Sequence, residues 1–236
     1  MGVAAIAAFA PTLILMYAIL RNYTYPKIEQ PFFSDPTLFK LFTVGLVEGI
    51  LLFAFYTYLD WRSMIYMALF AAIQCLALVV VLNLKRFHGK SDSVFYGYGL
   101  GLGMGCTMAF GTIYFLGKSI MSLEGNFVDI ESLVLLFVIG VAHVLLVSAM
   151  GATIGEGVAR LKPMEYTLQA ILVGVVFHLI LVAAYSSDGG IAFYASIVVS
   201  LIVAAVYFYY VMHVKLSGVI RDVLRMEGKN RADVPK

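Results

Sequence analysis

Charged residues are scarce in this sequence. Only 13% of its 236 residues are Asp, Glu, Lys or Arg, whereas 62% are hydrophobic and the mean hydropathy is +0.94. A soluble domain carries about twice that charged share. The net charge of +2 is too small to indicate a nucleic-acid partner. Cysteine is scarce as well: Cys75 and Cys106 are the two in the sequence, and both fall within apolar stretches, so no disulfide framework is expected. The composition excludes a soluble domain and makes the lipid bilayer the solvent.

Seven stretches are long and apolar enough to cross a bilayer. A spanning helix needs about 20 predominantly apolar residues, because hydrocarbon offers no hydrogen-bond partner to the backbone. The stretches lie near residues 3–20, 41–59, 64–84, 94–117, 132–153, 167–185 and 191–212. We predict an all-α integral membrane protein, with a seven-transmembrane helix bundle over residues 1–212 and a tail over 213–236. No basic residue precedes the first stretch, unlike a secretory signal peptide, and we expect it to be retained.

The basic residues predict the orientation of the bundle. Fourteen of the sixteen Lys and Arg residues lie in the first, third and fifth loops and in the tail, against Arg62 and Lys118 in the other loops. The tail contributes Lys215, Arg221, Arg225, Lys229, Arg231 and Lys236. Cytoplasmic loops carry the excess of Lys and Arg. We therefore predict a multi-pass protein of the cell membrane with its N-terminus outside and its C-terminus in the cytoplasm.

The tail is basic and amphipathic. Its apolar residues recur at helical spacing: Leu216, Val219, Ile220, Val223 and Leu224. Its basic residues lie off that stripe. A helix of this kind binds the membrane surface, and we expect it on the cytoplasmic face. The alternative is a solvated extension of the seventh helix.

The fourth stretch is rich in glycine at four-residue spacing. Gly97, Gly101 and Gly105 form one row, and Gly99 and Gly103 form a second. Lipid supplies no hydrophobic drive between helices, so association depends on close packing, which glycine permits. We expect the fourth helix to be central. Its rows pack within the chain, dock a helix of another membrane protein, or do both.

Three ionisable residues lie at membrane depth: Glu48, His143 and His178. Such residues are rare in spans because hydrocarbon does not solvate charge. Glu48 must be neutral or paired, and the two histidines are its obvious partners. An imidazole can ligate a metal, shuttle protons or bridge helices, and the spacing leaves these roles open.

Motifs in the fourth to sixth stretches follow a known pattern. Residues 92–108, DSVFYGYGLGLGMGCTM, match an Asp-Gly-x-x-Tyr-Gly opening and a run that ends in a functional glutamate. Residues 143–155, HVLLVSAMGATIG, match a helix that begins His-Ala, and His178 matches the histidine of the next span. Ala10 and Pro11 match an Ala-Pro pair near the start. Together these motifs resemble the PrsW family of intramembrane proteases, which is grouped with the CAAX-processing proteases and the anterior-pharynx-defective scaffold subunit of gamma-secretase.

The sequence departs from the PrsW pattern where that family carries glutamates. Met108 stands at one glutamate position, and Gln74 and Cys75 lie near the place of the Glu-Glu-x-x-Lys motif. Hydrolysis requires a base or a metal-bound water poised by carboxylates, and glutamine accepts no proton in that role. The resemblance thus implies the fold with both histidines kept. It also implies a noncatalytic pseudoprotease, as in the gamma-secretase scaffold subunit.

These observations lead to three functional hypotheses. The first is a noncatalytic scaffold or assembly subunit that contacts another membrane protein through the glycine-rich fourth helix and needs no cofactor. The second is an active intramembrane protease in which Glu48 works with His143 and His178, with zinc as the metal. The third is a haem-binding or transport protein in which the two histidines are axial ligands.

Overall fold

Apolar stretches of this sequence fold into α-helices throughout the computed structural model. It describes residues 1–25, 27–28, 30–123, 129–187, 190–228 and 234–235. The α-helices are α1 (Gly2–Leu20), α2 (Asp35–Tyr56), α3 (Met64–Leu82), α4 (Ser93–Leu123), α5 (Ile130–Ala159), α6 (Pro163–Ser186), α7 (Ile191–Tyr209) and α8 (Leu216–Met226). The described residues form no strand. Within the described residues, seven helices are long and apolar enough to cross a membrane, as predicted for a multi-pass helical membrane protein.

The helix ends differ most from the predicted spans at α2, α4 and α5, and α4 continues past residue 117 to Leu123. The α2 helix begins at Asp35, six residues before the predicted start near residue 41, because Ser34 is extended and Pro36 sits in the first turn, where proline is tolerated. The α5 helix continues past residue 153 to Ala159. Its additional residues, including Glu156, are buried by the protein rather than exposed to lipid.

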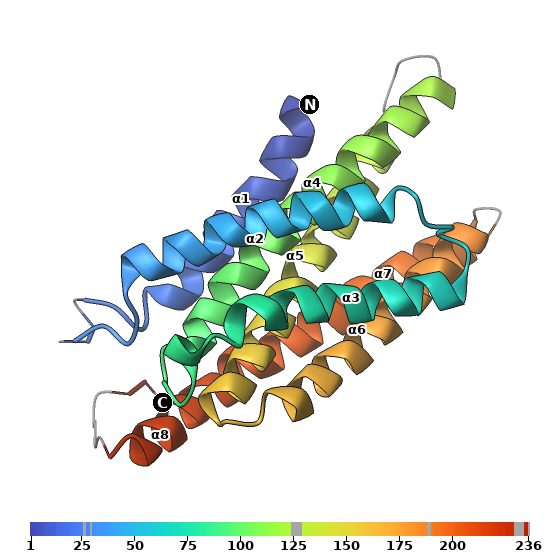
Figure 1. Ribbon diagram of the computed structural model, residues 1–236. Coiled ribbons are helices and arrows are strands. Elements are labelled where there is room, and N and C mark those ends of the chain that lie inside the picture. The colour runs from blue at the N-terminus through green and yellow to red at the C-terminus, as the bar shows by residue number, and fades with distance from the viewer. Residues whose placement is uncertain (26, 29, 124–128, 188–189, 229–233, 236) are drawn as a thin grey trace.

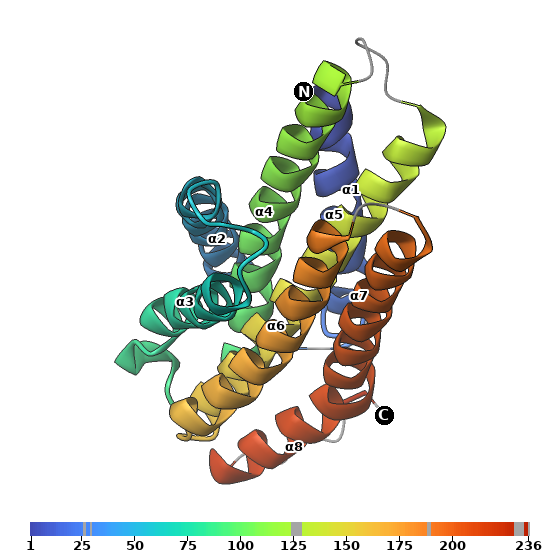
Figure 2. The same ribbon diagram turned by 90° about the vertical axis from the view of Figure 1, so that its right-hand side faces the viewer.

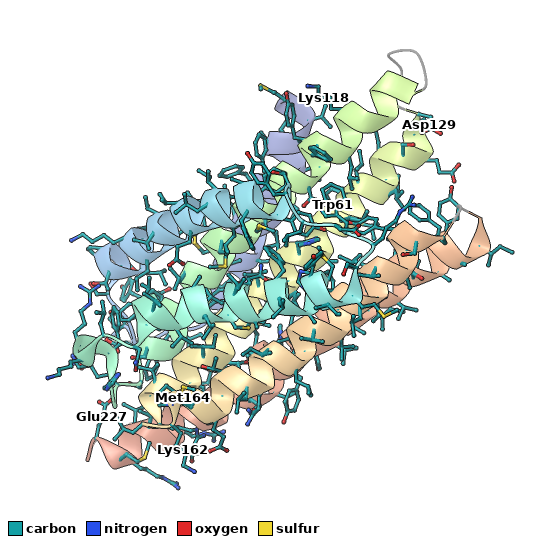
Figure 3. The ribbon with its side chains drawn as sticks, turned by 45° about the vertical axis from the view of Figure 1, so that its right-hand side comes forward. Trp61, Lys118, Asp129, Lys162, Met164 and Glu227 are labelled. Atoms are coloured by element: carbon teal, nitrogen blue, oxygen red, sulfur yellow. The ribbon has the colours of Figure 1, made fainter. Side chains whose placement is uncertain are left out.

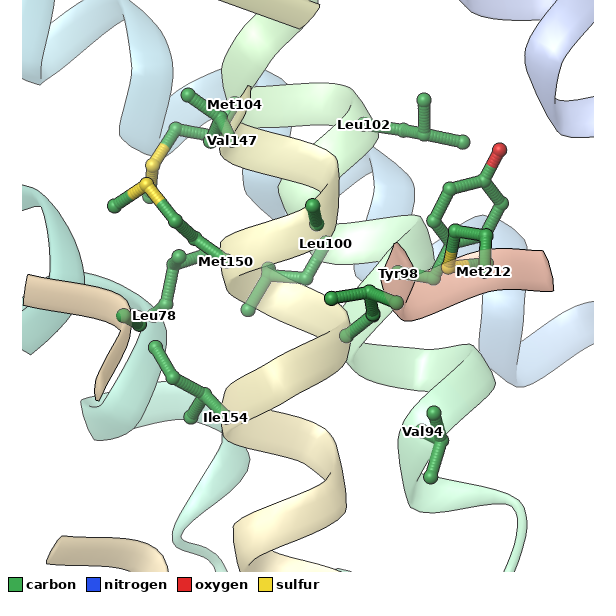
Figure 4. Close-up of a cluster of buried hydrophobic side chains, with 14 of the residues drawn as sticks. Leu78, Val94, Tyr98, Leu100, Leu102, Met104, Val147, Met150, Ile154 and Met212 are labelled. Carbon is green, nitrogen blue, oxygen red and sulfur yellow. The ribbon is translucent and has the colours of Figure 1, made fainter. Parts of the chain in front are cut away.

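Helices α4 and α5 form the centre of the bundle. They pack along each other, α2 covers one side of α4, and α1 contacts both α4 and α5 (Figures 1 and 2). On the other side, α6 and α7 pack against α5, and α3 packs mainly against α6. The central position predicted for the fourth helix is thus observed. Figure 4 shows the apolar core between α4 and α5, where Met104 of α4 and Met150 of α5 point toward each other.

The two glycine rows of α4 allow two helices to approach its backbone. A Cβ atom at Gly101 would lie 2.9 Å from the Cα of Ser148 on α5, and one at Gly105 would lie 3.1 Å from the Cα of Val144. A Cβ atom at Gly103 would lie 2.9 Å from the backbone nitrogen of Leu46 on α2. Both rows are therefore filled within this chain. Gly97 shares the α5 side and Gly99 the α2 side.

The described Lys and Arg residues gather at one end of the bundle. Figure 3 shows this end at Lys162 and Glu227 and the opposite end at Lys118 and Asp129. Of the described Lys and Arg residues, only Arg62 and Lys118 belong to the opposite end. The tail residues Lys229, Arg231 and Lys236 lie outside the described residues. We call the two ends the basic end and the opposite end.

The tail helix packs against the protein. The α7 helix runs through a π-helical turn, Tyr210–Lys215, into α8 without a break. Every member of the predicted apolar stripe is at most 4% exposed. These residues share one hydrophobic cluster with Phe32 and Phe33 of the first loop and with Phe87. The stripe expected on the membrane surface is thus covered by the basic end of the bundle itself.

Candidate functional site

The two membrane-depth histidines meet in the interior of the bundle. His143 lies in the middle of α5 and His178 in the middle of α6, and both are completely buried. Their ring centroids are 6.3 Å apart, and the rings are nearly perpendicular at 85°. We call this pair and its surroundings on α3 the histidine junction. Helices α5 and α6 are consecutive and antiparallel, which brings their midpoints together.

Each histidine is oriented by its own helix. Nδ1 of His143 donates a hydrogen bond to the carbonyl oxygen of Ile139 (3.0 Å), and Nδ1 of His178 donates to that of Gly174 (2.8 Å). Because a carbonyl oxygen only accepts, these bonds place the ring proton on Nδ1. Nε2 of a neutral ring is then an acceptor. Both Nε2 atoms are buried, and neither has a hydrogen-bond partner among the described residues.

Aromatic rings surround the histidine pair. Phe177 lies 5.2 Å from the His143 ring and 5.4 Å from the His178 ring, measured between centroids. Phe70 of α3 lies 5.4 Å from His178. A Cβ atom at Gly174, one turn before His178, would lie 3.3 Å from Cε of Met150. The imidazoles are therefore packed by apolar side chains.

Gln74, Cys75 and Met108, which the resemblance aligns with glutamates, are all buried. Gln74 is one turn after Phe70 on α3, so it shares the face that meets α6, and it is fully buried. Its amide oxygen and nitrogen both lack a partner among the described residues. Cys75 is a buried free thiol. Met108 lies one turn after Gly105, whose Cβ atom would come 3.3 Å from the carbonyl oxygen of His143.

Glu48 lies on α2, the helix that packs along α4. It lies between Gly45 and Gly49, which face the α4 backbone. It is half-buried, and its Oε2 atom has no hydrogen-bond partner among the described residues. The two imidazoles contact each other and aromatic rings, and their Nδ1 atoms bond to helix carbonyls. Among the described residues, Glu48 forms no hydrogen bond with either ring.

The donor set does not fit zinc, and the packing around the two rings does not fit haem. A structural zinc ion takes four protein ligands and a catalytic one three. Within the described residues, no three His, Cys, Asp or Glu side chains lie together in a group that could hold a metal ion. A haem between the two rings would have to displace Phe177, which packs against both. The junction thus presents two imidazoles and one carboxamide.

A second polar cluster, at the basic end, was not foreseen from the sequence. Glu156 of α5 is 3% exposed and forms ion pairs with Arg160 (3.0 Å) and Lys215 (3.1 Å). Arg160 also pairs with Asp222 of α8 (3.0 Å). Burial lowers the pKa of Arg160, but the carboxylates of Asp222 and Glu156 raise it above its ordinary value. In the sequence, the i,i+4 spacing of Glu156 and Arg160 could have indicated their ion pair. The cluster fastens α8 to α5.

Comparisons with known proteins return no relative. No family model, no curated protein and no solved structure matches the chain.

Proposed function

We propose that the chain is a noncatalytic scaffold or assembly subunit of a membrane complex, with a PrsW-like fold. The observation that carries this proposal is the surroundings of the histidine pair. Both imidazoles are held by helix carbonyls and aromatic rings, and the nearest position on α3 that the resemblance assigns to a carboxylate is Gln74. The site therefore has the family's histidines without its acid or base.

The missing carboxylates support a noncatalytic role. A water molecule at the two Nε2 atoms would need a carboxylate to take its proton, or a metal ion to lower its pKa. The carboxamide of Gln74 does neither, and the thioether of Met108 is only a weak acceptor. Glu48 forms no hydrogen bond with either Nε2 atom. Under this proposal the histidines bridge α5 and α6 and bind no cofactor.

The proposed partner contact lies outside the glycine rows, because those rows are filled by α2 and α5. Helix α4 is exposed only toward the opposite end, where Tyr114 and Phe115 are 36% and 39% exposed. Beside them is a groove of about 680 Å³ between α1, α4 and α5, with Ala4, Ala7 and Gly117 in its lining. Small residues let a second helix approach closely in lipid. A membrane helix of the partner fits this part of α4.

Photocrosslinking tests the scaffold proposal. A photoreactive phenylalanine replaces Tyr114 at the proposed contact, and a matched chain carries it at Val206, an exposed residue of α7. The proposal expects one membrane protein to crosslink in stoichiometric yield at Tyr114 and not at Val206. It also expects that partner to fall in abundance when the chain is deleted. Equal labelling at both positions, or an unchanged partner level after deletion, contradicts it.

An active intramembrane protease is the second candidate, favoured by the two buried Nε2 atoms that lack a described partner. Such atoms are suited to ligate a metal or to accept a proton. Membrane proteins from cells with the wild-type chain are compared with those from cells with His143→Ala. A cleavage product that disappears with His143→Ala, and also with Glu48→Gln, supports the protease. Identical products in all three samples leave the scaffold proposal standing.

The orientation is part of the same proposal. The excess of Lys and Arg at the basic end supports a cytoplasmic location for that end, with the N-terminus outside the cell membrane. Single cysteines at Lys27 and at Arg62, in a background without Cys75 and Cys106, test this with a membrane-impermeant reagent on intact cells. Labelling at position 62 and not at 27 is expected. The reverse pattern contradicts the orientation.

A further inference from the structure

A groove opens between α1 and α2 at the basic end. It has a volume of about 670 Å³, and its lining joins the last turns of α1, the first loop and the first turns of α2. Met16 and Leu20 contribute from α1, and Leu38 and Phe39 from α2. Phe33 and Leu38 are buried at 6% and 1% exposed, so they form its floor. The interior of the groove is therefore apolar.

Two cations stand at the mouth of this groove. Arg21 and Lys27 line it and are exposed. The guanidinium of Arg21 lies 5.8 Å from the Tyr17 ring centroid, and Nζ of Lys27 donates to Oδ1 of Asn22 (2.6 Å). Neither cation forms an ion pair with a described carboxylate. Asp35 also lines the groove, so the described lining has an excess of one positive charge.

We propose that this groove binds an anionic phospholipid. The acyl chains lie against Leu20, Leu38 and Phe39, and the headgroup phosphate binds between Arg21 and Lys27. The groove follows the ends of two membrane-spanning helices, so its apolar part is at the depth of acyl chains and its cations are at the level of headgroups. Arginine and lysine are the side chains that bind phosphate oxygens, and both retain free N–H donors here.

A lipid fits this groove better than a soluble anion or a protein helix. A soluble anion would leave the apolar floor in contact with water, whereas acyl chains cover it. A helix from another protein would bring an apolar face to the two cations and leave them unpaired. Basic pockets between spans at one membrane face are suited to acidic headgroups. The groove thus combines an apolar slot with a phosphate-binding mouth.

Native mass spectrometry of the full purified chain tests this proposal. The probes are phosphatidylglycerol as the anionic lipid, phosphatidylcholine as the neutral lipid and inorganic phosphate as the soluble anion. We expect tight retention of phosphatidylglycerol by the wild type and about thirtyfold weaker binding by the double variant Arg21→Gln/Lys27→Gln. Asp35→Asn, which removes the opposing carboxylate, should bind about fivefold more tightly.

The matched control is Lys85→Gln/Arg86→Gln, which removes two equally exposed cations from the same end of the bundle. It should bind phosphatidylglycerol like the wild type. Equal losses in both double variants would show a nonspecific charge effect and overturn the proposal. Equal retention of phosphatidylcholine, or displacement of the lipid by inorganic phosphate, would also overturn it. A thermal melt of each variant establishes that it is folded.

Discussion

The two glycine rows of α4, which we call the glycine seam, and the histidine junction both involve α5 but are built in opposite ways. In the seam, α4 presents hydrogen in place of side chains, so that α5 and α2 meet its backbone directly. At the junction, α3, α5 and α6 meet through large side chains, and four polar atoms of Gln74, His143 and His178 have no described partner. The seam is packing of backbone against backbone, and Tyr98, whose hydroxyl has no described partner, lies beside it on α4. The junction keeps polar groups that packing alone does not explain.

This difference teaches where to look for function. Buried polar atoms are nearly always hydrogen-bonded, and an unbonded one destabilises the fold by about 1–3 kcal/mol. Glycine packing carries no such penalty, and in lipid it is the main source of helix association. We therefore expect substitutions in the seam to lower the stability of the fold. Substitutions at the junction should reveal whether its polar groups are kept for function rather than for stability.

Filling the seam should have the largest effect. Gly101→Leu places a side chain where even a Cβ atom would lie 2.9 Å from the Cα of Ser148, so α4 and α5 must separate. We expect a loss of about 3 kcal/mol or more in unfolding free energy, measured by chemical unfolding in detergent micelles. The control is Gly218→Ala on α8, where nothing lies within 4 Å. That variant should be as stable as the wild type or more stable. A similar loss in both variants would contradict the view that close packing at the glycine seam stabilises the bundle.

A charge at the junction should have the next largest effect. Gln74→Glu introduces a carboxylate that is fully buried between apolar and aromatic side chains. An ionisable residue at membrane depth destabilises by about 2.5–3.5 kcal/mol on insertion scales when it is charged. The loss should therefore appear at neutral pH and shrink as the carboxylate is protonated at acidic pH. A pH series of melting temperatures, with Gln74→Leu as the uncharged comparison, measures it.

Removing the polar group at the same position should have a small effect of opposite sign. Gln74→Leu replaces two unbonded amide atoms by an apolar group of similar size. We expect the unfolding free energy to stay unchanged or to rise by about 1 kcal/mol. A loss above about 2 kcal/mol would show that Gln74 is hydrogen-bonded in the membrane, and hence that the junction holds water or a ligand.

The two cysteines offer the finest comparison. Cys106 follows Gly105 in the seam, and Cys75 follows Gln74 beside the junction; both are buried and free. Alkylation of single-cysteine variants reports local opening. We expect Cys75 to react faster, because unbonded polar atoms gain partners when the junction opens. Each tenfold difference in rate corresponds to about 1.4 kcal/mol in opening free energy. A faster reaction at Cys106 would contradict the expectation that the junction opens more readily than the seam.

The helices were predictable from the sequence, but most contacts at the site were not. The predicted spans 64–84 and 191–212 begin at the observed starts of α3 and α7, because hydropathy reports directly on segments that lipid can hold. The proposed partnership of Glu48 with the histidines had no comparable local signal. Which face of α2 meets α4 depends on Gly45 and Gly49, whose role emerges only when the two helices are packed.

In the tail, too, the helix could be predicted from the sequence but its contacts could not. Its helical spacing correctly placed Leu216, Ile220 and Leu224 on one apolar stripe. The same stripe is suited to a membrane surface or to a protein surface, since both remove apolar area from water. The structure decides between them by burying the stripe in the hydrophobic core of the bundle, whose other members include Phe32, Phe33 and Phe87, more than a hundred positions away in the chain.

The sequence by itself determined that seven apolar helices cross the membrane and that the basic residues gather at one end. Each of these features depends only on the residues of one segment and on the inability of hydrocarbon to bond a backbone or solvate a charge. Only the tertiary structure decided that the glycine rows are filled within the chain, that the imidazoles bond to helix carbonyls, and that α8 folds onto the bundle. Those outcomes depend on faces contributed by distant segments, and the pattern of a single helix does not specify its neighbour.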